Sequence, residues 1–125
     1  MAKEFTFYGR STEEMQKMSM DDFIKLVPSR ARRKFTRGLT AAEKTFMKNL
    51  AKGANLETHC RDLVIVPAML GKIIKVHNGK DFVPITIELT MLGHRLGEFA
   101  GTTKKVQHSA PGIGATRSSS ALSVR

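Results

Sequence analysis

The clearest β-hairpin signal in the chain lies in KIIKVHNGKDFVPITI, residues 72–87. Asn78 and Gly79 both tolerate a positive φ, as a type I′ turn requires, and β-forming apolar residues flank them. We therefore expect strands over residues 72–76 and 82–87, with the type I′ turn at Asn78-Gly79 between them.

A third β signal lies upstream. Residues 63–66, LVIV, form a short, strongly apolar run that ends at Pro67, and we expect this run to be the first strand of the sheet. Pro84 has no amide hydrogen to donate, so its side of the last strand must lie at an edge or an irregularity. With the helices that precede it, this pattern predicts an α+β fold, in which a small three-stranded sheet packs with two or three short helices.

Helical periodicity precedes the strands. Ser19 is placed as an N-cap, and apolar residues over 20–27 recur at helical spacing until Pro28 ends the helix. Thr40 and Glu43 form a capping box for a helix that ends at Gly53. Its inward face is expected to hold Ala42, Phe46 and Leu50. Its outward face carries Lys44, Lys48 and Lys52, which either contact nucleic acid or keep the helix soluble.

Between these helices lies the most basic segment, SRARRKFTRG, residues 29–38. As a helix it places Ala31 and Phe35 on one side, and its cations gather on another: Arg30, Arg33, Lys34 and Arg37. Like charges this close destabilise a helix unless a counter-charge is present. We therefore interpret the segment as a helix that docks on phosphates.

The end of the chain changes character. Gly93 and Gly97 indicate a bend or a close backbone approach, which we expect to admit an RNA backbone. From residue 100 onward small and polar residues dominate, so this stretch cannot bury enough surface to fold alone. We expect an N-terminal arm over 1–12, an α+β body over 13–99, and an extended basic tail over 100–125 that becomes ordered on RNA.

Charge and composition narrow the class of protein. The chain has 125 residues, 41% hydrophobic and 26% charged, with a net charge of +10. Residues 23–61 hold ten basic and two acidic residues, so the positive charge is clustered, and a polyanionic partner is the first hypothesis. No apolar run is long enough to span a bilayer, and one cysteine, Cys60, excludes an internal disulfide framework. We expect a soluble cytoplasmic protein.

An active site is not visible in the sequence. Four histidines and Cys60 are the candidate metal ligands, and none has the spacing typical of a zinc site. No two carboxylates are marked as a catalytic pair, and no phosphate-binding loop follows a strand. We therefore expect no enzymatic activity, no metal and no cofactor.

Three blocks of sequence resemble a known family. The blocks Asn78-Gly79-Lys80, Phe82-Val83-Pro84 and 93–99, GHRLGEF, resemble the small-subunit ribosomal protein family S-nineteen. Upstream, RARR at 30–33 is similar to the archaeal and eukaryotic branch, whose eukaryotic member is called S-fifteen, and so is the segment 108–119. Ala68 and His77 depart from the residues usual in the family, and the last six residues lack its usual aromatic and terminal lysine.

The resemblance implies a structural constituent of the small ribosomal subunit head, which binds ribosomal RNA beside a protein of the S-thirteen family. It also implies a tail directed towards the decoding region, near transfer RNA and messenger RNA. The residues expected to bind ribosomal RNA are Arg30, Arg32, Arg33, Lys34, Arg37, Lys72, Asn78, Lys80, His94, Arg95, Lys104, Lys105 and Arg117. The alternatives are a free-standing nucleic-acid-binding regulator and a small basic enzyme that acts on RNA, for which His94 would be the residue to test.

Overall fold

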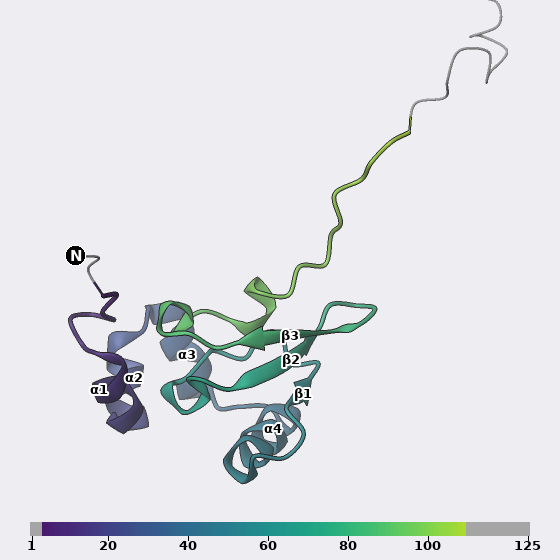
Figure 1. Cartoon of the computed structure of the whole chain (residues 1–125). Coiled ribbons are helices and arrows are strands. Elements are labelled where there is room, and N and C mark those ends of the chain that lie inside the picture. Colours follow the sequence, from purple (N-terminus) through teal and green to yellow (C-terminus); the bar gives the residue numbers. More distant parts are fainter. Residues whose placement is uncertain (1–3, 110–125) are drawn as a thin grey trace, which may run out of the picture.

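The computed structural model describes residues 4–109, and within them the hairpin at 72–87 organises a small sheet (Figure 1). Strands β2 (Ile73–His77) and β3 (Phe82–Thr86) are antiparallel, with Ile74 opposite Ile85. The short strand β1 (Glu57–Thr58) pairs in parallel with β2, which gives the order β1-β2-β3. β3 is therefore an edge strand, as Pro84 requires. The prediction of an α+β fold with a three-stranded sheet is confirmed.

Four α-helices precede the sheet: α1 (Thr12–Lys17), α2 (Met20–Leu26), α3 (Ser29–Arg37) and α4 (Ala41–Lys52). α2 and α4 have the caps that the sequence predicts, whereas α3 starts after Pro28 without a side-chain cap and ends at Gly38. Ser19 accepts from the Asp22 amide, Thr40 and Glu43 form a capping box, and Gly53 ends α4 in the left-handed region. α1 was not predicted, although Ser11 and Glu14 form a second capping box at its start.

Residues 63–66 do not form a strand of the sheet, so that prediction is wrong. All four side chains are buried, and the backbone bonds instead to the turn segment after β3. The Ile65 amide donates to the His94 carbonyl, and the Gly93 and Leu96 amides donate back to Ile65 and Leu63. Side chains along a strand alternate between the two faces of a sheet, so a run that is apolar at every position must be covered on both faces. In a two-layer fold one face of the sheet is open to solvent, and such a run does not fit there.

The turn between β2 and β3 also differs from the prediction. It spans the four residues 78–81, and of these only Gly79 has a positive φ. The Asn78 side-chain oxygen accepts from the amides of Lys80 and Asp81, at 2.9 and 2.8 Å. The asparagine thus folds the loop with its side chain rather than with a left-handed backbone, as asparagines in turns commonly do.

The core lies between the helices and one face of the sheet. Phe23, Phe46 and Leu50 contribute to it from α2 and α4, and Ile74 and Ile85 contribute from β2 and β3. In α4 the inward position next to Thr40 belongs to Glu43 rather than to Ala42, which is exposed. One short 3-10 turn, η1 (Pro67–Met69), precedes β2, and two more, η2 (Leu89–Met91) and η3 (Leu96–Glu98), follow β3. Residues 101–109 are exposed and run away from the body (Figure 1).

Candidate nucleic-acid interface

Helix α3 carries the basic face that the sequence predicts. It begins directly after Pro28 and ends at Gly38, with Ala31 buried against the core and Phe35 half-buried. Arg30, Arg33 and Arg37 are exposed. Within residues 4–109, none of these three guanidinium groups has a hydrogen bond or an ion pair. They are cations with unused donors, which is the state required for binding phosphate.

Arg32 lies on the same helix but is used internally. Its Nε atom donates to the Ile24 carbonyl at 3.2 Å, and Nη2 donates to the carbonyls of Lys25 and Val27 at 3.0 and 3.2 Å. These carbonyls are at the end of α2, where the helix leaves them without intrahelical partners. Arg32 therefore ties α2 to α3, and in this arrangement most of its donors are occupied.

Lys34 also turns away from the exposed row. Its Nζ atom lies 2.6 Å from Oε1 of Glu43, whose side chain is only 3% exposed. Burial alone would raise the pKa of Glu43, but hydrogen bonds from Lys34 and the Thr40 amide, with the charge of Lys34, outweigh it and lower the pKa. Lys34 thus neutralises a buried carboxylate and joins α3 to the start of α4.

The segment that follows η2 brings a second set of predicted residues to α3. Arg95 lines a shallow hollow together with Arg30, Arg33, Lys34 and Arg37. Its guanidinium is 3.4 Å from the exposed carboxylate of Asp62, a contact too long and too open to water to hold it firmly. His94 is adjacent, with Nδ1 2.7 Å from Glu98. We call Arg30, Arg33, Arg37 and Arg95 the arginine face.

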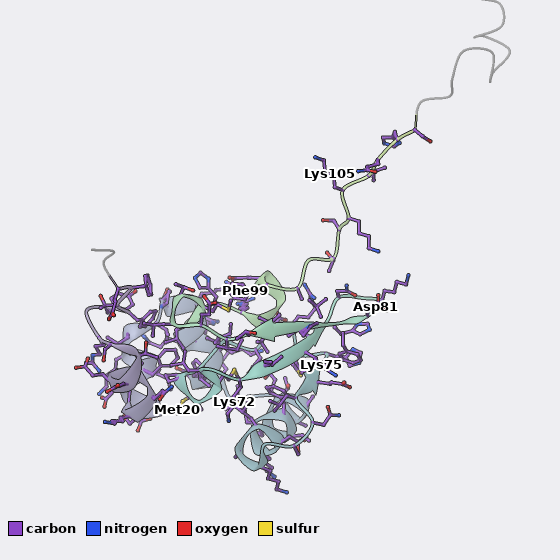
Figure 2. All side chains as sticks on the ribbon, viewed as in Figure 1. Met20, Lys72, Lys75, Asp81, Phe99 and Lys105 are labelled. Atoms are coloured by element: carbon purple, nitrogen blue, oxygen red, sulfur yellow. The ribbon has the colours of Figure 1, made fainter. Side chains whose placement is uncertain are left out.

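The hairpin residues form a separate group. The loop 78–81 projects beyond β2 and β3, and Asp81 at its end points away from the body (Figure 2). Lys80 is exposed there, whereas the Asn78 side chain is occupied in folding the loop. Lys72 is part-buried, and its Nζ atom donates to the Leu50 carbonyl near the end of α4 at 3.1 Å. The structure therefore does not bring Lys72 or the loop to the arginine face.

The predicted tail residues fall in two parts. Lys104 and Lys105 are exposed on the extended segment that leaves the body, and Lys105 extends freely from it in Figure 2. Arg117 lies outside the described residues. For these positions RNA binding stays a prediction.

Arg61 is a key residue that sequence reasoning missed. Its Nη1 atom donates to the His77 carbonyl at 2.6 Å, and Nη2 donates to the Gly97 and Ala100 carbonyls, each at 2.8 Å. A Cβ on Gly97 would lie 3.0 Å from the Cβ of Arg61. The close approach predicted at Gly97 therefore accommodates Arg61, not an RNA backbone. No periodicity marks Arg61, and the glycine was the only signal.

The described residues contain neither a metal-binding cluster nor a membrane-spanning helix. Among residues 4–109 there is no group of three His, Cys, Asp or Glu side chains placed to hold a metal ion. In the same part of the chain no helix is both long and apolar enough to cross a membrane. The arginine face gathers four cations on one surface of a small α+β body, which is typical of a nucleic-acid-binding protein.

Comparison with known proteins gives the family. Residues 29–108 match the family model described as "Ribosomal protein S19". The chain is also 45% identical to the "Small ribosomal subunit protein uS19" of Picrophilus torridus, over 99% of this chain and 83% of that protein. The chain therefore belongs to the ribosomal protein S19 family, and the resemblance stated above is confirmed.

Proposed function

We propose that this protein is a structural constituent of the small ribosomal subunit in the cytoplasm, where it binds ribosomal RNA without catalysing a reaction. The observation that carries the proposal is the arginine face, on which three exposed α3 guanidinium groups, unpaired within residues 4–109, adjoin Arg95. The family match and the name of the 45% identical relative support the same function.

The proposed mechanism is phosphate neutralisation by a preformed surface. α3 is held in place by Arg32 on one side and by the Lys34–Glu43 pair on another. Its free arginines are therefore already positioned when RNA arrives, and binding releases condensed counterions. Lys80 on the hairpin loop and the cations of the tail would extend the contact to other parts of the RNA.

Finer features of the proposal come from the family resemblance. We propose that the protein lies in the head of the subunit beside a protein of the S-thirteen family. Its tail would run towards the decoding region, with Lys104, Lys105 and Arg117 on RNA and with transfer and messenger RNA nearby. Cross-linking from positions 104 and 105 in intact ribosomes tests the tail, because cross-links confined to RNA distant from bound transfer RNA would contradict its direction.

The main test compares a variant that lacks three positive charges on α3 with a variant that lacks three positive charges on α4. The variant Arg30→Gln, Arg33→Gln, Arg37→Gln should lose occupancy in salt-washed small subunits, and the slope of log affinity against log salt should fall by about 2 to 3. The matched control is Lys44→Gln, Lys48→Gln, Lys52→Gln, which removes the same charge from an exposed helix face. Occupancy of the α3 variant equal to that of the unaltered protein at high salt would contradict RNA docking through α3, and absence of the unaltered protein from salt-washed particles would favour a free-standing regulator.

A further inference from the structure

The N-terminal arm forms a tight turn with an unusual residue in it. The amides of Phe7 and Arg10 each donate to the other's carbonyl at 3.0 Å, which leaves Tyr8 and Gly9 as the two turn residues. Their φ angles are +49° and +78°, both in the left-handed region. Within residues 4–109, Tyr8 is the only residue other than glycine with a positive φ. A tyrosine pays free energy for this conformation, and such strain concentrates at functional sites.

The turn fixes the position of the Tyr8 ring. Phe7 packs against the core, with its ring centroid 6.3 Å from that of Phe23, so the arm is anchored. The Tyr8 ring meets Phe7 edge-on, with centroids 4.9 Å apart and planes at 89°. It remains 65% exposed. The strained turn therefore holds a flat aromatic surface out to solvent, and core packing does not explain its presence.

Beside this ring lies a hollow that is lined by both apolar and charged side chains. Phe7, Pro28 and Leu92 line it together with Tyr8, and Arg30 and Arg95 line it as well. The same two arginines also line the hollow of the arginine face. The carboxylate of Glu98 is present too, but it is engaged by His94 at 2.7 Å. The apolar surface thus continues directly into the phosphate-binding surface.

We propose that this hollow binds one unpaired nucleotide of RNA, with its base stacked on Tyr8 and its flanking phosphates on Arg30 and Arg95. The inference rests on the proposed function, since it names one contact of the same RNA-binding surface. Charge complementarity favours a nucleotide over a protein side chain, because an aromatic ring beside two guanidinium groups matches a base attached to phosphates. Unpaired bases stack on aromatic side chains in this way in many RNA complexes.

The experiment uses the fact that Tyr8 is the only tyrosine in the chain, which also has no tryptophan. Protein with ring-labelled tyrosine gives NMR signals from Tyr8 alone. The probes are an eight-nucleotide oligoadenylate and an abasic oligoribose phosphate with the same number of phosphates. Both should bind, but only the oligoadenylate should shift the Tyr8 ring signals upfield, through the ring current of a stacked base.

Variants of Tyr8 separate stacking from folding. Tyr8→Asn removes the ring but suits the left-handed turn, so it should fold with undiminished thermal stability. It should bind oligoadenylate about tenfold more weakly or worse and bind the abasic probe unchanged. Tyr8→Phe should bind both probes as the unaltered protein does.

The outcomes distinguish this inference from the proposed function. If both probes bind and the Tyr8 signals stay in place, or if Tyr8→Asn binds oligoadenylate at full affinity, the nucleotide pocket is wrong while RNA binding by the arginine face stands. A protein side chain would then be the better candidate for the hollow. If neither probe binds at low salt, both the pocket and the phosphate-binding face are refuted.

Discussion

The arginines of this protein divide by what their guanidinium groups touch. Arg32 and Arg61 each bond to three backbone carbonyls, whereas Arg30, Arg33 and Arg37 bond to nothing within residues 4–109. The first kind acts in folding and the second is free for a ligand. The sequence does not distinguish these two kinds of arginine, because all five residues lie in basic or irregular segments. Only the fold shows which carbonyls lack partners.

The role of Arg61 is testable by a change to lysine. A lysine keeps the charge, but its donors all lie on one nitrogen, which cannot reach the carbonyls that Arg61 contacts through two separate nitrogens. Arg61→Lys should therefore lower the free energy of unfolding by about 2 kcal/mol, because hydrogen bonds from a charged donor are lost. Urea unfolding measures this, with Arg33→Lys as a control that should leave the midpoint unchanged. Equal midpoints for both variants would contradict the role of Arg61.

Glu43 predicts a dependence of stability on pH. Its pKa is lowered in the folded protein from an ordinary value of 4.5, so the folded state resists its protonation. The stability that Glu43 contributes is complete above pH 4.5 and is lost as the pH falls below that value, through the folded-state pKa. Thermal unfolding at a series of pH values should show this loss.

The matched variant for that experiment is Glu43→Gln. It should be less stable than the unaltered protein by about 1 to 2 kcal/mol at neutral pH, since the pair with Lys34 is gone. The difference between the two proteins should shrink as the pH is lowered from 5 to 3. A constant difference over that range would show that the carboxylate charge is not what stabilises the fold.

At the scale of elements, local signals predicted the helices better than the strands. α2 and α4 have N-cap residues, stops and periodic apolar positions within a few residues of one another, and α3 lies between Pro28 and Gly38, so their bounds follow from the sequence. Residues 63–66 carry no such information. Whether a fully apolar run pairs in a sheet depends on which segment reaches it, and here the segment from Gly93 to Leu96 does.

In the candidate nucleic-acid interface, too, the sequence predicted what local patterns determine and missed what depends on distant contacts. The outward face of α3 was predicted because helical spacing fixes which side chains align. Its junction with Arg95 depends on how the chain returns after β3, and the strained turn at Tyr8 depends on packing of the arm against Phe23. These features come from contacts between distant segments, which no local pattern encodes.

The hairpin loop gives a prediction for a single element. Asn78→Ala removes the two bonds to the Lys80 and Asp81 amides, so amide exchange at these two residues should accelerate, with a loss of about 1 kcal/mol of stability. Lys80→Ala should leave the exchange at Asp81 unchanged while weakening RNA binding. Unchanged exchange in the Asn78 variant would show that the loop is held by the strands alone.

The contacts of Ala100 show where the folded body ends and the tail begins. The predicted boundary assigned residue 100 to the tail, but Ala100 is fully buried and its carbonyl accepts from Arg61. A chain that ends at residue 101 should therefore keep the thermal transition of the full-length protein and still bind RNA, with a smaller dependence on salt.

A chain that ends at residue 99 is the matched comparison, because it lacks only two further residues. It should unfold at a lower temperature, since the carbonyl that Arg61 contacts at Ala100 is removed. Differential scanning calorimetry of both proteins measures the difference in their unfolding temperatures. Identical transitions would place the boundary before Ala100.

The three carbonyls around Arg61 have a structural consequence. One planar side chain joins His77, the last residue of β2 beside the hairpin loop, to Ala100 at the start of the tail through two hydrogen bonds. Loss of the Arg61 guanidinium should therefore loosen the hairpin loop and the start of the tail together, although the two segments are far apart in the sequence.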